Sequence, residues 1–323
     1  MKPPIFIVGE GRSGTTALRK MLGEHPAIWA VPKESYVFAK KWPQANPCYK
    51  FTKLDDLVLA LAIGMNRVGQ SLNKRGAAKY TRDVLAGGEL ESHIQGFMDS
   101  FKASEELSVI ARNEAIQAID VFDAICKFML KQKSATRFVE KTPYHLYCLD
   151  EIRASYPEAK IIAIYRDPRA VVLSWLRRKA SLKSLLGAAQ SWSRATTEML
   201  KHKADPNYKI IRYEDLISEP ETSLKDLMNF IGEDFVPELL KEQKVNSSFE
   251  EQRGQTGMQL SSLNRWQEEL SPLQIALIDK VCGKHYQELG LEMASSSNLF
   301  LGIYYLYQWF NSVVIKSLKF LSS

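Results

Sequence analysis

The sequence predicts an α/β fold in which a central, mostly parallel sheet is flanked by helices, in three layers. Short apolar runs rich in β-branched residues, at positions 5–8, 161–165 and 208–212, alternate with segments whose apolar residues recur at helical spacing. Strands that are apolar on both faces are typical of parallel sheets covered by helices. With 323 residues, of which 45% are hydrophobic and 25% charged, the chain can bury a full core, and a disordered chain, a collagen and a small disulfide scaffold are excluded.

The opening of the chain predicts a strand, a glycine-rich turn and a helix. The apolar run at 5–8 ends at Gly9, and apolar residues at helical spacing then continue to Gly23. From about residue 42 to residue 133 the pattern is mostly helical. We expect this stretch to be an insertion that packs over the core and shapes a substrate pocket.

The second half of the chain continues the alternation. Strands are expected at 137–139 and 161–165. Asp167 and Pro168 then have the residue types that begin a helix, as the N-cap and the first helical residue. The strand at 208–212 precedes a helix whose apolar positions are Leu224, Leu227, Met228 and Ile231.

A main domain, residues 1–295, is expected to be followed by a hydrophobic C-terminal tail, residues 296–323. Residues 299–315 carry no charge and many aromatic side chains, and Lys316 and Lys319 follow. This stretch is shorter than the ~20 residues of a membrane-spanning helix. It suits either an interfacial helix on a membrane surface or a helix docked on the protein body or on a second subunit.

The charge and the cysteine content of the chain limit the kinds of ligand and the cellular compartment that we expect. Lys and Arg number 43 against 37 Asp and Glu, and this net charge of +6, without a long basic run, suits an anionic ligand and not nucleic acid. The first apolar run is too short for a secretory signal, so a cytoplasmic protein is expected. Four cysteines without a CxxC pair are expected to be reduced and buried: Cys48, Cys126, Cys148 and Cys282.

Residues 9–16, Gly-Glu-Gly-Arg-Ser-Gly-Thr-Thr, indicate an anion-binding loop between the first strand and the first helix. Such a turn lets backbone N–H groups converge on an anion, and the helix N-terminus adds partial positive charge. Gly9 and Gly14 have the spacing of a P-loop, so the fold is expected to be P-loop NTPase-like. Thr15 replaces the Lys that a nucleoside triphosphatase uses, and the cation of the loop is Arg12, which argues against ordinary ATP hydrolysis.

Three segments, in this order, resemble the sulfotransferase family that uses 3′-phosphoadenosine 5′-phosphosulfate (PAPS). Residues 11–16 resemble its loop for the 5′-phosphosulfate. Residues 166–169, Arg-Asp-Pro-Arg, together with Ser174 resemble its 3′-phosphate motif, and residues 212–216 resemble a later strand end. The pattern is nearer to the bacterial and the protein-tyrosine or carbohydrate branches than to the cytosolic branch that acts on small phenols.

The resemblance implies PAPS as co-substrate and 3′-phosphoadenosine 5′-phosphate (PAP) as product. No metal is expected, because the donor anhydride already has a good leaving group and the sequence has no spaced cluster of His, Cys and Asp. A strand-end Arg and a helix-borne Ser can converge at the carboxyl edge of the sheet. Tyr213 is interpreted either as a nucleotide contact or as a packed core residue, and Arg265 stands where the family more usually has Lys. Arg169, Arg177 and Arg178 either tune the basic field around the donor or are solvated helix positions, and the solvated interpretation is preferred for Arg177 and Arg178. The implied donor-binding residues are Gly11, Arg12, Ser13, Gly14, Thr15, Thr16, Arg166, Ser174, Tyr213 and Arg265.

The resemblance also implies Glu34, Lys141 and Arg12 as catalytic residues. Glu34 resembles the general base of the protein-tyrosine and carbohydrate branches, and a solvated loop glutamate is the alternative. Lys141 resembles the Lys that reaches the sulfuryl group, with an ion pair to Glu140 as the alternative. His145 is the rival base.

The predicted function is therefore transfer of a sulfuryl group from PAPS to an acceptor hydroxyl, on a carbohydrate, a lipid or another small molecule, by in-line displacement. Two alternatives stay open: a P-loop kinase of a small molecule, and a non-catalytic module that binds an anion and a membrane. The sequence identifies neither the acceptor nor the oligomeric state.

Overall fold

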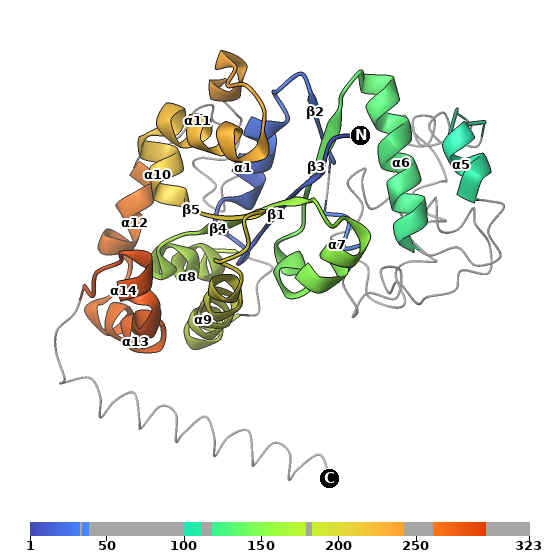
Figure 1. The fold of residues 1–323 in the computed structure, drawn as a ribbon. Helices are drawn as coiled ribbons and strands as arrows, with labels where there is room; N and C mark the ends of the chain where they lie inside the picture. Colours follow the sequence, from blue (N-terminus) through green and yellow to red (C-terminus); the bar gives the residue numbers. More distant parts are fainter. Residues whose placement is uncertain are drawn as a thin grey trace, which may run out of the picture.

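Five parallel strands form one sheet in the order β2-β3-β1-β4-β5 (Figure 1). The computed structural model describes residues 1–32, 34–38, 100–101, 103–110, 118–178, 183–241 and 261–294. The strands are β1 (Ile5–Gly9), β2 (Ile28–Ala30), β3 (Arg137–Lys141), β4 (Lys160–Tyr165) and β5 (Tyr208–Arg212). The predicted fold class is confirmed, since every pairing in this sheet is parallel.

The helices fall between and after the strands along the chain. The α-helices are α1 (Thr15–Leu22), α5 (Glu105–Ile110), α6 (Ala118–Lys133), α7 (Leu149–Ser155), α8 (Pro168–Leu176), α9 (Leu185–Lys201), α10 (Tyr213–Ser218), α11 (Pro220–Ile231), α12 (Ser261–Glu269), α13 (Pro272–Cys282) and α14 (Tyr286–Leu289). The 3₁₀ helices are η1 (Pro143–Tyr147), η2 (Pro237–Leu240) and η4 (Gly283–His285).

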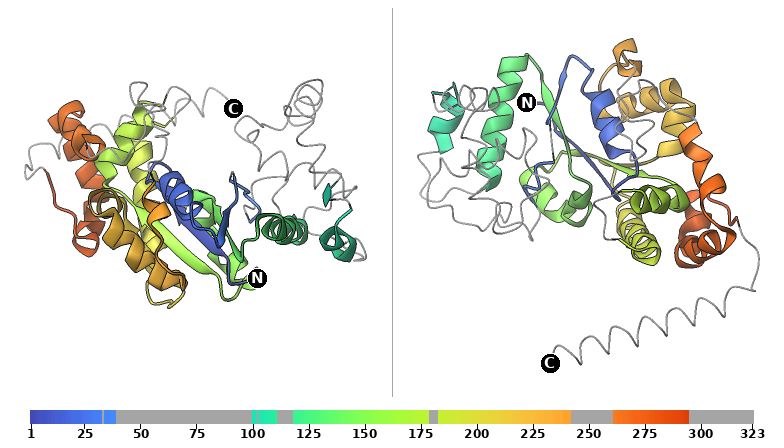
Figure 2. Two further views of the ribbon diagram at one scale, coloured as in Figure 1. Left: turned by 90° about the horizontal axis from the view of Figure 1, so that it is seen from above. Right: turned by 180° about the vertical axis from the view of Figure 1, so that it is seen from behind.

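Helices cover both faces of the sheet (Figures 1 and 2). Side chains alternate between the two faces along a strand. In β1, therefore, Ile5 and Ile7 pack with residues of α1, α10 and α11, whereas Phe6 and Val8 pack with residues of α6, α7, α8 and α9. All four side chains are fully buried, so β1 lies at the centre of the core.

The predicted start of α8 is confirmed in atomic detail. The Asp167 carboxylate accepts a hydrogen bond from the backbone N–H of Arg169 at 2.8 Å, and Pro168 is the first helical residue. The sequence did not predict β2, which has three residues and therefore too little pattern to detect.

Parts of two predictions lie outside the described residues. Of the predicted helical insertion only α5, α6 and a few neighbouring residues are described, and the tail at 296–323 is not described. In the part of the chain that is described, no helix is long and apolar enough to cross a membrane. Cys126, Cys148 and Cys282 are buried free thiols, as expected, while Cys48 lies outside the described residues.

Candidate functional site

The glycine-rich turn after β1 leads directly into the N-terminus of α1. Gly14, the N-cap of α1, has φ +95°, and a Cβ atom there would lie 2.1 Å from the Tyr213 ring. A Cβ atom on Gly9 would lie 2.4 Å from the carbonyl oxygen of Ile164. Glycine is therefore required for the turn to fit against its neighbours. No side chain caps α1, so its first N–H groups, those of Thr15 and Thr16 among them, are available to an anion.

Ser13 differs from the rest of the turn. Its side chain is fully buried, its Oγ atom has no hydrogen-bond partner among the described residues, and its N–H donates to the carbonyl of Glu10 at 3.3 Å. Ser13 therefore faces the protein body, although the sequence groups it with the donor-binding residues.

Arg12 joins the turn to α8. Its Nε donates to Ser174 Oγ at 3.0 Å, which brings together two residues that lie 162 positions apart in the sequence. Burial lowers the pKa of Arg12, and the charges of Arg178 and Arg166 lower it further. Three guanidinium groups thus act on the same region, and such a cluster suits a ligand with several negative charges.

Arg166 and Tyr213 flank the turn from the ends of β4 and β5. The Arg166 guanidinium lies over the Tyr213 ring, 4.6 Å from its centroid, and the same ring lies against Gly14. Tyr213 therefore both packs on the loop and borders the cationic group, so the two interpretations from the sequence are compatible.

Glu34 follows β2 along the chain and lies beside Lys141, the last residue of β3, on the same edge of the sheet. Its Oε1 accepts a hydrogen bond from the Lys141 ammonium, and its Oε2 accepts one from the hydroxyl of Tyr36. The side chain of Lys141 is buried, whereas that of Glu34 is 32% exposed. The expected alternative partner of Lys141, Glu140, points to the opposite face of the strand, as the alternation of side chains requires.

Glu140 forms a separate buried network with His145. Glu140 Oε1 accepts from the N–H and hydroxyl of Ser35 at 3.1 and 2.9 Å and from Thr142 Oγ1 at 2.5 Å. His145 Nδ1 lies 3.0 Å from Glu140 Oε2, and its Nε2 accepts the N–H of Phe38 at 3.4 Å. His145 is fully buried and both ring nitrogens are engaged, so this geometry does not offer it to an acceptor.

Arg178, which the sequence analysis interpreted as solvated, is half-buried. Its charge lowers the pKa of Arg12 and also acts on the Tyr36 hydroxyl, so it is close to both the loop and the residue that bonds to Glu34. Arg177, by contrast, is 40% exposed and pairs with Glu269 at 2.5 Å. A helical pattern alone does not separate these neighbours, since Arg177 is the C-cap of α8 and Arg178 is the next residue.

Two further arginines lie on α8 and α12, two helices that pack against each other. Arg169 is buried, forms an ion pair with Asp167 at 2.6 Å and stacks 4.1 Å from the centroid of the Trp266 ring, which ties α8 to α12. Arg265 lies half-buried on α12, which packs against α8. Its proposed contact with the donor stays a prediction.

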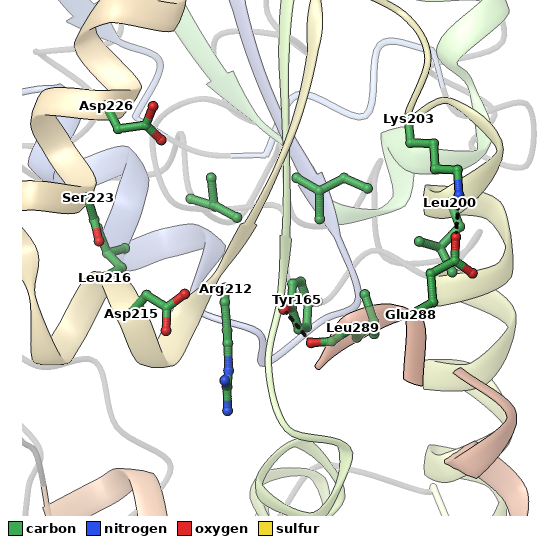
Figure 3. Close-up of a pocket in the computed structure, with 12 residues that line it drawn as sticks. Tyr165, Leu200, Lys203, Arg212, Asp215, Leu216, Ser223, Asp226, Glu288 and Leu289 are labelled. Atoms are coloured by element: carbon green, nitrogen blue, oxygen red, sulfur yellow. Dashed lines mark hydrogen bonds and ion pairs between the residues drawn. The ribbon is translucent and has the colours of Figure 1, made fainter. Parts of the chain in front are cut away.

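A cavity of about 420 Å³ lies at the free edge of β5 (Figure 3). The Lys203–Glu288 ion pair and the hydrogen bond from Tyr165 to the carbonyl of Leu289 border it. None of Arg12, Glu34 and Lys141 lines this cavity. Among the described residues, no three His, Cys, Asp or Glu side chains gather as metal ligands would, and the expectation of a metal-free reaction stays a prediction.

Comparison with known proteins adds an independent finding. The model of the sulfotransferase family matches residues 3–237. Protein-tyrosine sulfotransferase 1 of Danio rerio is 25% identical over 300 residues, which are 90% of this chain and 69% of that protein. Protein-tyrosine sulfotransferase 2 of Gallus gallus is 25% identical over 242 residues, 71% of this chain and 51% of that protein. The chain thus spans about two thirds of the first relative and half of the second.

A solved structure shows the same fold. The sulfotransferase domain from the curacin biosynthetic pathway superposes with a TM-score of 0.58, and the match covers 91% of this chain and 99% of that domain. The sequence identity is 18%, so this likeness concerns the fold.

Proposed function

The chain belongs to the sulfotransferase family, and on that premise we propose that Glu34 is the general base in transfer of a sulfuryl group from PAPS to an acceptor hydroxyl. One observation carries the proposal. A partly exposed carboxylate is paired with a buried lysine at the sheet edge where the loop begins. The charge of Arg178 acts on Arg12 of the loop and on the Tyr36 hydroxyl that bonds to Glu34, so donor-binding and proton-accepting groups share one region.

The residues present fit the donor. The uncapped N-terminus of α1 and Arg12 suit the 5′-phosphosulfate, and Arg166 and Ser174 suit the 3′-phosphate. Glycine at positions 11 and 14 lets the rings of Trp175 and Tyr213 pack directly against the loop backbone. Thr15 and Thr16 add hydroxyl groups at the same helix end.

Each catalytic residue has one task. The bound donor supplies a sulfuryl group attached to a phosphate that is a good leaving group. Glu34 takes the proton of the acceptor hydroxyl at Oε1. Lys141 then neutralises charge that builds on the sulfuryl oxygens, and Arg12 neutralises the departing phosphate.

The proposed acceptor comes from the names of the relatives and from the residues that follow Lys141. The names of the two relatives make the phenolic hydroxyl of a tyrosine in a peptide or protein the first acceptor to test. Tyr144 and Tyr147, exposed and with ring centroids 5.3 Å apart, lie on η1 directly after Lys141 and offer an aromatic rim to such a group. A carbohydrate or lipid hydroxyl is the next acceptor to test. For the C-terminal tail, contact with a membrane or with a second subunit stays a proposal.

The first test is a thermal-shift titration with PAP, ATP–magnesium and AMP. PAP at about 100 times its dissociation constant is expected to raise the free energy of unfolding by about 2.7 kcal/mol. AMP, which lacks the 3′-phosphate, is expected to stabilise the protein far less. Stabilisation by ATP–magnesium alone would overturn the proposal and favour a small-molecule kinase.

A further inference from the structure

Tyr36 is the second partner of Glu34. Its hydroxyl donates a hydrogen bond to Oε2, while Lys141 holds Oε1. Both oxygens of Glu34 are therefore engaged in this structure. A carboxylate oxygen can accept more than one hydrogen bond, so an acceptor hydroxyl can approach Glu34 beside these partners or in place of one of them.

The backbone holds Tyr36 in an uncommon conformation. Its φ is +53°, a left-handed value that a bulky L residue rarely adopts. Its N–H donates to Thr142 Oγ1 at 3.4 Å, and the preceding Ser35 donates twice to the buried Glu140 carboxylate. These bonds fix the segment to the end of β3, and backbone strain of this kind persists only where the surroundings impose it.

We propose that Tyr36 is a positioning residue, which holds the Glu34 carboxylate in place while the acceptor hydroxyl replaces Lys141 at Oε1. This inference rests on the proposed function. The acceptor O–H bond breaks and its proton goes to Oε1. The acceptor oxygen forms the new bond to sulfur, and the bond from sulfur to the 5′-phosphate oxygen breaks with its electron pair on the phosphate. Lys141 moves to the sulfuryl group, and Tyr36 stays on Oε2.

The choice of which partner leaves follows from charge. Lys141 carries a positive charge that the reaction needs elsewhere, whereas the Tyr36 hydroxyl is neutral. Burial raises the pKa of Tyr36, and the Glu34 charge and the hydrogen bond to Glu34 raise it further, so the hydroxyl remains a donor through the neutral range. The other charges that act here, Arg19 and Glu140 on the sheet side and Arg178 on the loop side, remain in a Tyr36→Phe protein.

The test is carbon-13 NMR of the ligand-free protein at neutral pH. Glutamate side chains are labelled at the carboxyl carbon, and the signal of Glu34 is identified by its loss in Glu34→Gln. Loss of the hydrogen bond to Oε2 in Tyr36→Phe is expected to shift that signal, because a donor to the carboxylate changes the distribution of charge over its two oxygens. Tyr156→Phe is the matched control, because the hydroxyl of this buried tyrosine also donates to a carboxylate, that of Asp123, at 3.1 Å. It should leave the Glu34 signal unchanged.

An unchanged Glu34 signal in Tyr36→Phe overturns the proposal. If that protein does not fold, 3-fluorotyrosine incorporated at position 36 keeps the shape of the ring and makes the hydroxyl a stronger donor. The Glu34 signal is then expected to shift from its position in the unmodified chain, and a signal that stays in place overturns the proposal. Neither experiment needs donor or acceptor, so the outcome is independent of the PAP titration that tests the proposed function.

Discussion

Glu34 and His145 differ in what their side chains already contact. Both oxygens of Glu34 reach partners that a bound donor and acceptor can replace, and the side chain is partly exposed. His145 is bonded on both ring nitrogens inside the core. A general base must be able to reach the proton that it removes, and this favours Glu34.

Replacement of the base should remove turnover and spare donor binding. Glu34→Gln keeps the shape of the side chain but cannot accept the acceptor proton, so turnover of PAPS is expected to fall roughly 10²- to 10⁴-fold. Binding of PAP, measured by calorimetry, should stay unchanged. The exposed Glu158→Gln is the control. Normal turnover in Glu34→Gln would remove Glu34 as the base and bring His145 forward.

Arg166 is expected to distinguish nucleotides by their 3′-phosphate. In Arg166→Ala the affinity for PAP should fall roughly 10- to 100-fold more than the affinity for AMP, since a hydrogen bond to a charged group contributes about 1.5–3 kcal/mol. Arg177→Ala is a matched control on the neighbouring helix, because Arg177 is exposed and pairs with Glu269. An equal loss for PAP and AMP would contradict the assignment of Arg166 to the 3′-phosphate.

At the scale of elements, characteristic residue types predicted more of the structure than the spacing of apolar residues did. The glycine-rich turn and the Asp-Pro helix start were recognised because their residue types have few other uses. The short strand β2 and the position of Arg178 were not, since the first has three residues and the second depends on how α8 is rotated against the loop. The opposite directions of Glu140 and Lys141 follow from the alternation in β3 once its register is known.

The turn itself can be tested with two glycines that both have positive φ. Gly14→Ala would place a Cβ atom against the Tyr213 ring, so PAP affinity is expected to fall at least about tenfold as the loop shifts. Gly232→Ala has φ +74° but no neighbouring atom within 4 Å, so it should cost about 1–2 kcal/mol of stability and leave PAP binding unchanged. Calorimetry with PAP and urea unfolding measure the two effects. Equal PAP affinity in both variants would show that the packing of Tyr213 on the loop does not shape the donor site.

At the scale of the whole molecule, the sheet order determines which residues meet. Periodicity predicted parallel strands but not the order β2-β3-β1-β4-β5, in which β1 lies between β3 and β4. This order places Lys141, Gly9 and Arg166, at or just after the ends of three adjacent strands, on one edge of the sheet. The resemblance to the sulfotransferase family, and not the periodicity of apolar residues, predicted that these residues lie close together.

The buried Glu140 links the stability of the fold to pH. Burial tends to raise its pKa, but His145, Thr142 and the N–H of Ser35 together hold that pKa below its usual value. In the pH range between the folded and the unfolded pKa values, the unfolded chain therefore binds more protons. The stabilisation is fully present above about pH 4.3, the usual pKa of an unfolded glutamate, and is lost as the pH falls through the lower folded value.

Glu140→Gln should reduce stability near neutral pH and flatten its loss in acid. Four donor groups converge on the carboxylate, so the NH₂ group of glutamine would face at least one of them, at a cost of about 1.5–3 kcal/mol. Urea unfolding between pH 3 and pH 7 measures both effects, with Glu158→Gln as the exposed control. If Glu140→Gln lost stability in acid as steeply as the unmodified chain, the acid sensitivity of the fold would come from other carboxylates. Because this network also anchors Ser35 beside Glu34, its loss in acid is expected to loosen the base as well as the core.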